Sequence, residues 1–296
     1  MIRSPLFYVG DKYKLMPQLV EYFPKNIDLY VEPFFGGGSS QLFVNANKYA
    51  LNDIDSYIIK IHQMLLSYSH KRSQFFEEVF TIINYYGLSC SYKENSIPNE
   101  LKKQYPKTYY AKFNKIAYEN LKKDYNGNKD DIVKLYLLLI YGFNHMVRFN
   151  KRGDFNLPVG NVDFNKNVYK ALNDYFDIQE KRNITFSSLD YKKFLNELYL
   201  NENSFVYLDP PYYISQSEYN KFWSKQDEIE LYEYLDSLSE KGIKFGITNL
   251  LTHKGKTNEI FKMWSQKYNC KVVKSNYISF NDNTIKDTSI ELYVFN

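Results

Sequence analysis

The residues Asp209, Pro210 and Tyr212 belong to an Asp-Pro-Pro-Tyr sequence whose residue types suit chemistry on a planar amine. A carboxylate and a main-chain carbonyl can each accept one hydrogen bond from an amino group, and two such acceptors would turn the nitrogen lone pair toward an incoming methyl group. We therefore expect Asp209 and Pro210 to hold an exocyclic amine for methylation, and Tyr212 to stack on its ring. The alternative is a rigid diproline turn after a strand.

The elements that must position this tetrapeptide are those of an α/β sheet. The apolar run at 204–208 predicts a buried strand, and open α/β sheets bind ligands at the carboxyl ends of their strands. Further strands are expected at 28–35, 49–52, 183–186, 243–247, 271–274 and 289–295, the last two antiparallel. Residues 70–147 have a mostly helical period, and the Gly and Pro residues of 153–160 indicate a hairpin.

These elements predict one Rossmann-like, mostly parallel sheet with an antiparallel edge strand, assembled from both ends of the chain. We expect a first catalytic part at 1–55, a helical target-recognition insertion with a β-hairpin at 56–165, and a second catalytic part at 166–296.

Composition and charge limit the class of protein. The chain has 296 residues, of which 44% are hydrophobic and 18% aromatic, which is too apolar for a disordered chain. Its net charge of +4, with basic clusters in the middle third, permits a nucleic-acid partner. Two distant cysteines indicate neither a metal site nor a disulfide. Because no signal core and no run of about 18 apolar residues occurs, we expect a cytoplasmic protein that does not enter a membrane.

A glycine-rich segment, Gly36–Ser39, follows the first predicted strand, and the pattern then indicates a helix from residue 41. The segment has neither the Gly-Lys-Ser/Thr of a P-loop nor G-x-G-x-x-G spacing. Asp53, at the end of the next strand, lies near the offset at which nucleoside-binding proteins place an acid for ribose hydroxyls. A helix N-cap is the alternative for Asp53.

Three further residues could contact a nucleoside ligand. Tyr8 could stack on a purine, and Lys12 could pair with a carboxylate. Asp190, shortly after a predicted strand, could accept a hydrogen bond from an adenine amino group, or it could be a simple turn residue.

Several short segments occur in a fixed order along the chain, at 8–12, 31–39, 52–54, 188–191 and 209–212, with further ones at 141–144 and 148–160. Together they resemble the Dam-type (D12 class, alpha group) DNA adenine-N6 methyltransferases, and the resemblance covers most of the chain. It implies a class I methyltransferase sheet. It also implies transfer of a methyl group from S-adenosyl-L-methionine to N6 of an adenine flipped out of double-stranded DNA, leaving S-adenosyl-L-homocysteine, without a metal.

Position by position, the resemblance implies two sets of site residues. Those implied to bind S-adenosylmethionine are Tyr8, Lys12, Pro33, Phe34, Gly36, Asp53, Ile54, Asp190, Tyr191 and Asp209. Those implied to contact DNA are Phe143, Asn144, Arg148, Asn150, Arg152 and Pro158. Of these, Phe143 would wedge into the base stack, Asn144 would meet the orphaned partner of the extruded adenine, and Arg148 would contact a base edge.

The resemblance also implies partners. They are double-stranded DNA with a short adenine-bearing recognition site, and a cognate restriction endonuclease in a restriction-modification or DNA-protection system. Because Phe7 stands where GATC-specific relatives carry a lysine, we expect a site other than GATC. We also expect a monomer. Two alternatives stay open: a methyltransferase acting on another planar amine, such as an RNA adenine or a glutamine amide, and a non-catalytic DNA-binding protein with this fold.

Overall fold

The chain divides into two compact units in the computed structural model, which describes residues 2–94, 97–215, 223–273 and 289–296. The helical unit comprises Met1–Tyr13, Gly36–Leu42 and Asp55–Arg182. The sheet unit comprises Lys14–Phe35, Phe43–Ile54 and Asn183–Asn296. These boundaries differ from the expected ones, because residues 1–13, 36–42 and 166–182 make most of their contacts within the helical unit. The division into catalytic and target-recognition parts stays a prediction.

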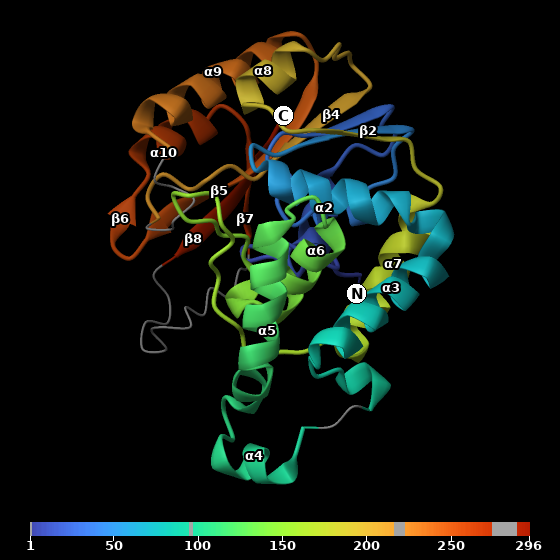
Figure 1. Ribbon diagram of the computed structural model, residues 1–296. Helices are drawn as coiled ribbons and strands as arrows, with labels where there is room; N and C mark the ends of the chain where they lie inside the picture. The colour runs from blue at the N-terminus through green and yellow to red at the C-terminus, as the bar shows by residue number, and fades with distance from the viewer. Residues whose placement is uncertain (1, 95–96, 216–222, 274–288) are drawn as a thin grey trace. The chain divides into compact units, whose positions relative to one another are not determined.

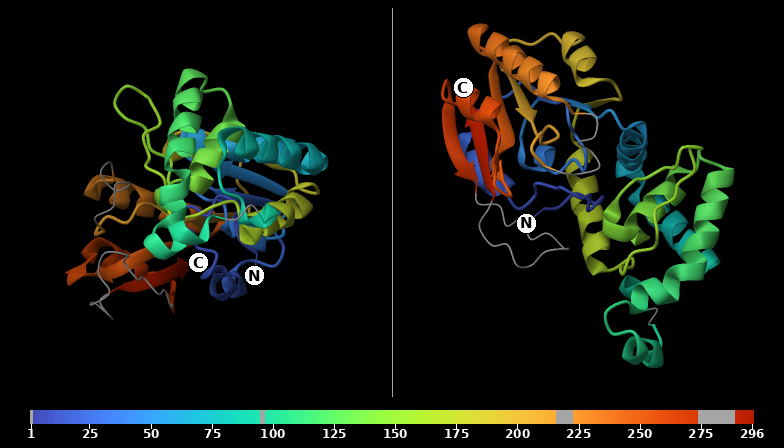
Figure 2. Two further views of the ribbon diagram at one scale, coloured as in Figure 1. Left: turned by 60° about the horizontal axis from the view of Figure 1, so that its bottom comes forward. Right: turned by 90° about the vertical axis from the view of Figure 1, so that its left-hand side faces the viewer.

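One sheet forms the core of the sheet unit. Its strands are β1 (Leu29–Glu32), β2 (Lys48–Asn52), β3 (Ile184–Ser187), β4 (Ser204–Leu208), β5 (Lys244–His253), β6 (Lys256–Thr257), β7 (Asn269–Val273) and β8 (Ile290–Phe295). Their order is β3-β2-β1-β4-β5-β8-β7, and β6 pairs with β5 (Figure 1). The first five strands in this order are parallel, and β8 lies antiparallel between β5 and β7. Strands β8 and β7 form the red edge in Figure 2. The predicted mostly parallel sheet with an antiparallel edge is confirmed.

The two faces of the sheet are covered by different elements, because successive side chains of a strand point to opposite faces. Val206 and Leu208 of β4 belong to a buried cluster with three helices. These helices are α8 (Tyr191–Asn196), α9 (Lys225–Glu240) and α10 (Glu259–Ser265). Phe205 and Tyr207 point the other way, where the Phe23 ring lies 4.7 and 5.4 Å from theirs, just after α1 (Met16–Leu19) and the 3₁₀ helix η1 (Val20–Tyr22). Burial on both faces explains the continuous apolar sequence of β4.

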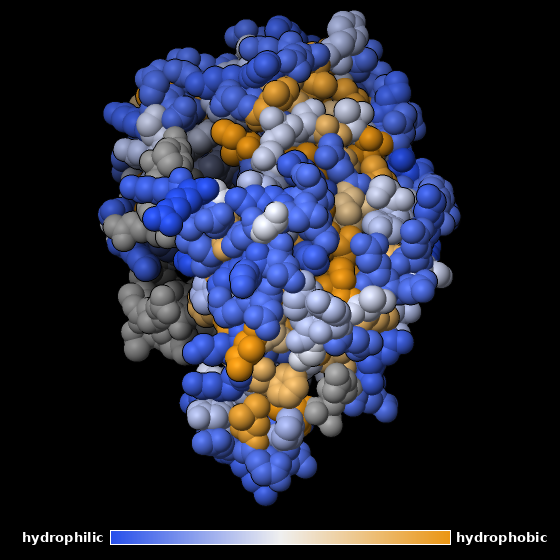
Figure 3. All heavy atoms as spheres, viewed as in Figure 1, coloured by the Kyte–Doolittle hydropathy of each residue, from blue (hydrophilic) through white to orange (hydrophobic). Residues whose placement is uncertain are grey.

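The helical unit is built around one apolar helix. Its helices are α2 (Ser56–Ser67), α3 (Arg72–Tyr86), α4 (Asn99–Gln104), α5 (Tyr109–Gly127), α6 (Ile132–Tyr141) and α7 (Lys166–Gln179). Residues 135–141 of α6 have no exposed surface, because α6 packs against α2, α3 and α5 (Figure 1). The face of the molecule in Figure 3 is mainly hydrophilic, with smaller hydrophobic areas between. The predicted helical character of residues 70–147 is confirmed.

The predicted helix after the glycine-rich segment is wrong. Only a 3₁₀ turn, Ser40–Phe43, forms there, and β2 begins at Lys48. The hydroxyl of Tyr49 donates to the carbonyl oxygen of Val44 at 2.9 Å and accepts from the amide of Ala46 at 3.0 Å. The intervening backbone is therefore satisfied in a non-helical form, and too few residues remain for an α-helix. The predicted hairpin at 153–160 is a loop closed by isolated bridges, Phe149 with Phe155 and Gly142 with Val159, rather than by regular strands.

His62, on α2, anchors the glycine-rich segment within the helical unit. Its Nε2 lies 3.0 Å from the carbonyl oxygen of Gly36, and the Ser4 hydroxyl donates to the carbonyl oxygen of Gly37. Gly36 has φ +45°, and a Cβ on Gly37 would lie 2.8 Å from the Cβ of Tyr8, so this loop requires glycine. Burial lowers the pKa of His62 to about 4, although the hydrogen bond to Gly36 acts in the opposite direction.

We expect His62 to make the free energy of unfolding fall as the pH drops from 6.5 toward about 4. In that window the unfolded histidine binds a proton and the folded one does not, which is worth on the order of 3 kcal/mol. Denaturant unfolding of the wild type and His62→Gln at neutral and acidic pH measures the effect. The wild type should lose more stability than the variant, and an equal loss would contradict this role.

Candidate functional site

Asp209 directly follows β4, at the carboxyl end of the strand, as the sequence predicts. Its Oδ1 accepts hydrogen bonds from Oγ1 of Thr248 on β5, at 2.9 Å, and from the hydroxyl of Tyr212, at 2.8 Å. The carboxylate is half-buried and Pro210 after it is buried. The Asp209 carboxylate is therefore held at a fixed place at the carboxyl end of β4.

Glu291 is a residue of this site that the sequence reasoning missed. Its side chain is fully buried on β8, and its Oε1 lies 2.6 Å from the hydroxyl of Tyr212. Two carboxylates, those of Asp209 and Glu291, thus converge on one hydroxyl group. A glutamate within an apolar strand sequence was the only local sign of this role. Its partner Tyr212 lies 79 residues away along the chain, so the sequence alone did not connect the two.

Asn52, the last residue of β2, joins the loops that follow β1 and β3. It is fully buried. Its Nδ2 donates to the carbonyl oxygens of Pro33 and Leu189, both at 3.0 Å, and its Oδ1 accepts from the amide of Leu189 at 2.9 Å. The predicted residues after these three strands therefore share one edge of the sheet, and Asn52 was not predicted from the sequence.

The residues predicted after β2 lie at this edge. Asp53 is half-buried, and Ile54 is 76% exposed, which is unusual for a large apolar side chain. Asp53 is not the N-cap of α2, because Asp55 accepts from the amide of Tyr57 at 2.9 Å and fills that place. The ligand-binding interpretation of Asp53 stays a prediction.

The residues predicted after β3 have structural partners of their own. Asp190 is the N-cap of α8 and accepts from the amide of Lys192 at 3.0 Å. The ring of Tyr191 is mostly buried, 5.1 Å from the ring of Phe34 and 5.6 Å from that of Trp223. Phe34 and Tyr191 thus form an aromatic group at the edge where Pro33 and Asp53 lie.

Tyr8, Lys12 and Gly36 belong to the helical unit. The side chain of Tyr8 packs against the glycine-rich segment, with its Cδ1 4.0 Å from a Cβ placed on Gly36. The structure therefore brings together Asp53, Asp209 and their neighbours in one unit, and Tyr8 with Gly36 in the other.

The residues Phe143 and Asn144, predicted to contact DNA, form a strained turn directly after α6. Asn144 and His145 both have positive φ, 55° and 49°. Phe143 is 52% exposed, so it is not part of the helix core. The amide of Phe143 donates to the carbonyl oxygen of Pro158 at 2.9 Å, which holds the turn against the hairpin loop. Strain of this kind, with an aromatic ring left in solvent, is typical of a functional surface.

Two glycines permit this turn. A Cβ on Gly142 would lie 2.6 Å from the carbonyl oxygen of Leu138, and one on Gly160 would lie 2.6 Å from the carbonyl oxygen of Gly142. The two backbones therefore approach more closely than any other residue type allows.

The hairpin loop carries the remaining residues predicted to contact DNA. Arg148 donates from Nε and Nη2 to Asn156, both at 2.9 Å, which fixes its guanidinium to the loop. The side chain of Asn150 accepts from the amides of Arg152 and Asp154 and so builds the turn itself. Asn150, Arg152 and Pro158 are exposed.

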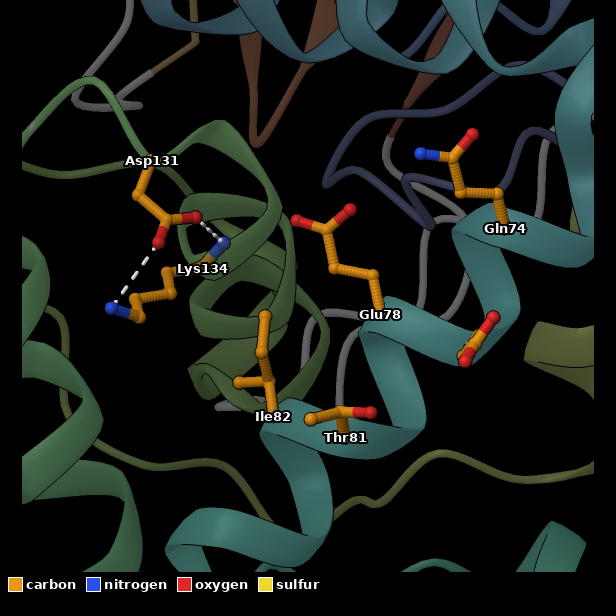
Figure 4. Close-up of a pocket in the computed structure, with 7 residues that line it drawn as sticks. Gln74, Glu78, Thr81, Ile82, Asp131 and Lys134 are labelled. Carbon is orange, nitrogen blue, oxygen red and sulfur yellow. Dashed lines mark hydrogen bonds and ion pairs between the residues drawn. The ribbon is translucent and has the colours of Figure 1, made fainter.

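An open pocket of about 430 Å³ lies elsewhere on the helical unit (Figure 4). Its lining residues are Gln74, Glu77, Glu78, Thr81, Ile82, Asp131 and Lys134. None of the predicted site residues is among them. The three carboxylates would repel DNA phosphates, so we do not consider this pocket the functional site.

Two features are absent from the part of the chain that the structure describes. No helix in the described ranges is long and apolar enough to span a membrane. Nor do three or more His, Cys, Asp or Glu side chains gather there in a way that could hold a metal ion.

We expect Asn52→Leu to lower the free energy of unfolding by roughly 2 kcal/mol or more, because buried main-chain groups of Pro33 and Leu189 lose their partners. Asn47→Ala is the matched control, since the Asn47 amide donates to Asp28 at 3.1 Å on the exposed surface. This control should change stability by less than about 0.5 kcal/mol. Urea unfolding of both variants measures the difference, and similar midpoints would refute the role of Asn52.

Comparison with known proteins is in line with this geometry. The family of D12 class N6 adenine-specific DNA methyltransferases matches residues 8–278. The chain is 33% identical to the Type II methyltransferase M.FokI of Planomicrobium okeanokoites, over 100% of this chain and 43% of that protein. It is 31% identical to the modification methylase StsI of Streptococcus sanguinis, over 97% and 41%. It is 26% identical to the DNA adenine methylase of Escherichia coli (strain K12), over 98% and 95%.

The chain thus spans about two fifths of the length of the first two relatives and nearly all of the third. The family match covers the Asp209 motif, the Asn52 edge and the Phe143 turn. On this match, and on a sheet of the expected topology, the chain belongs to the D12 class of N6 adenine-specific DNA methyltransferases.

Proposed function

We propose that this protein is an S-adenosylmethionine-dependent methyltransferase that methylates N6 of an adenine flipped out of double-stranded DNA. The observation that carries the proposal is the Asp209 carboxylate, which Thr248 and Tyr212 fix at the carboxyl end of β4 beside the buried Pro210. An acceptor held in place before the substrate arrives needs no reorganisation during the reaction.

The proposed mechanism uses this acceptor together with the carbonyl oxygen of Pro210. Each accepts one hydrogen bond from the adenine amino group, which turns the nitrogen lone pair away from the protein acceptors. When bound, S-adenosylmethionine supplies an electrophilic methyl group on a sulfonium cation. Asp209 polarises the amine. As the N–C bond forms, the bond between the methyl group and sulfur would break and leave S-adenosyl-L-homocysteine. The methylated nitrogen, now acidic, would then lose its proton to water.

Tyr212 is proposed to stack on the adenine ring. Its hydroxyl lies 2.8 Å from Oδ1 of Asp209 and 2.6 Å from Oε1 of Glu291, and its one proton bonds one of them at a time, so its ring is held close to the acceptor. An amine that binds Asp209 meets a carboxylate whose Oδ1 already accepts from Tyr212 and Thr248. Tyr212 therefore keeps the carboxylate in position until the base arrives.

The cofactor is proposed to bind at the carboxyl ends of the strands. Its residues in the sheet unit are Pro33, Phe34, Asp53, Ile54, Asp190, Tyr191 and Asp209. The buried Asn52 fixes the loops that carry most of them, and the carboxylates of Asp53 and Asp209 suit hydroxyl donors and a cationic ligand. We assign Tyr8, Lys12 and Gly36 to the same cofactor from their motifs alone. Equilibrium binding of S-adenosylmethionine to Asp53→Ala and Lys12→Ala tests these assignments separately from activity.

The DNA-binding residues are proposed to be those of the Phe143 turn and the hairpin loop. An exposed ring on a strained turn can enter a base stack and restore part of the stacking lost when a base is extruded. Arg148, Asn150, Arg152 and Pro158 follow on the adjoining loop, and the exposed Arg152 adds positive charge for the phosphates.

The biological setting is also part of the proposal. Relatives carry the names Type II methyltransferase and modification methylase. We infer that this chain modifies a short adenine-bearing site in a restriction-modification system, in the cytoplasm, with a cognate endonuclease as its counterpart. Mapping N6-methyladenine in a methylation-free bacterium that expresses the chain would identify the site.

We expect Asp209→Ala to lower the methylation rate more than about 10²-fold, because one of the two acceptors is lost. Asp209→Asn keeps the size and one acceptor oxygen and should fall between Ala and wild type. Transfer of tritiated methyl groups to DNA under single-turnover conditions measures the rate, and thermal unfolding checks that both variants fold. Near wild-type methylation by Asp209→Ala would show the mechanism to be wrong.

Tyr212 offers a second test that separates its ring from its hydroxyl. We expect Tyr212→Phe to keep methylation within about 10-fold of wild type, because the ring that stacks on the base remains. Tyr212→Ala should lose about 10- to 100-fold, since base stacking on an aromatic ring is worth roughly 1–3 kcal/mol. Single-turnover rates of the two variants decide between the roles. An equal loss in both would assign the function to the hydroxyl instead.

A further inference from the structure

Arg3 is held between two aromatic rings of the helical unit. Its guanidinium carbon lies 4.4 Å from the centre of the Phe7 ring and 4.5 Å from that of the Tyr13 ring. Its Nε is 3.9 Å from Oδ2 of Asp11, whose side chain is only 4% exposed. The guanidinium thus lies over two rings and within ion-pair distance of a buried carboxyl group, and these contacts limit the positions it can take. The side chain is therefore oriented before any ligand binds.

The outer edge of this guanidinium has no hydrogen-bond partner among the described residues. Within the ranges that the structure describes, neither Nη nitrogen of Arg3 makes a hydrogen bond, and the side chain is 36% exposed. Two other arginines are engaged: Arg72 pairs with Asp177 and Glu180, and Arg148 donates twice to Asn156. Arg3 thus presents two parallel donors from a fixed plane.

The position of Arg3 within its unit is informative. The ring of Phe7, on which Arg3 stacks, lies 5.7 Å from the ring of His145, at the end of the strained turn that begins with Phe143. The charge of Arg3 acts on this turn: burial is the main cause that lowers the pKa of His145, and Arg3 adds to it. The donor pair therefore lies near the turn that we propose to enter the DNA.

We propose that Arg3 reads a guanine in the recognition sequence, with its two Nη nitrogens donating to O6 and N7 of the base. This inference rests on the proposed DNA-methyltransferase function. A planar donor pair in a fixed plane matches the two acceptors of guanine in the major groove, which is the commonest specific contact of arginine with DNA. Phe7 has no donor of its own, and its ring serves as the platform that orients Arg3.

The first experiment uses the wild-type protein. After its methylated site is mapped, each guanine near the target adenine is replaced in turn by 7-deazaguanine, which lacks the N7 acceptor. We expect one replacement to lower kcat/KM at least about 10-fold. A recognition site without a guanine, or no sensitive guanine, would overturn the proposal.

The second experiment tests whether that guanine is the base that Arg3 contacts. Arg3→Ala and Arg3→Lys should lower kcat/KM on the natural site by about 10- to 100-fold and should relax the preference at that one position. On the duplex with 7-deazaguanine there, the same variants should lose clearly less than on the natural site, because the hydrogen bond to N7 is already absent and only the one to O6 remains to be removed. Arg72→Ala is the control, since that arginine is paired on the surface and should leave both rates unchanged.

The outcomes distinguish the inference from the proposed function. An equal loss on every duplex, with a weaker dependence on salt, would make Arg3 a phosphate contact and overturn base reading. Wild-type rates in both Arg3 variants would overturn this inference and leave the proposed function standing. A wild-type protein that binds S-adenosylmethionine but methylates no DNA would defeat both. Thermal unfolding of the variants confirms that they fold.

Discussion

The buried amide of Asn52 is the interaction on which the loops at the carboxyl ends of β1 and β3 depend. Where β1, β2 and β3 end, the ladder hydrogen bonds stop, and main-chain groups away from water need other partners. One amide offers two donor hydrogens and an acceptor oxygen, and Asn52 uses them on Pro33 and Leu189. The loops thus leave the sheet at fixed positions, which sets where Phe34, Asp53 and Asp190 lie.

A second buried polar group connects α9, α10 and β5 within the sheet unit. The carboxylate of Glu228, on α9, accepts hydrogen bonds from Trp223, Tyr232, Asn249 and Asn258. Four donors offset the cost of removing a carboxylate from water. Asn249 follows Thr248 on β5, and the two side chains point to opposite faces, so one strand joins the helix layer to the hydroxyl that holds Asp209.

Local sequence was enough to predict β4 and the place of Asp209, because an apolar run and a diproline turn are short-range signals. It was not enough for Asn52, whose partner Leu189 lies 137 residues away, or for Glu291 beside Tyr212. The helix expected after Gly36–Ser39 failed for a similar reason, since the Tyr49 hydroxyl from the next strand satisfies the backbone there. Motif order identified the family, whereas the contacts that fix each motif depend on the tertiary fold.

The two proposed surfaces are stabilised in opposite ways. At the carboxyl ends of the strands, the side chains of Asn52 and Asp209 have hydrogen-bond partners, and neither residue has a positive φ. At the Phe143 turn, Asn144 and His145 adopt left-handed conformations that cost about 1–3 kcal/mol each. Hydrogen bonds from the amides of Phe143 and Gly160 to the carbonyl oxygens of Pro158 and Tyr141 hold the turn in this conformation. A ring that a fixed turn already presents to solvent could enter a base stack without a prior change of the turn. A mobile loop would first lose conformational entropy when its ring became ordered between the bases.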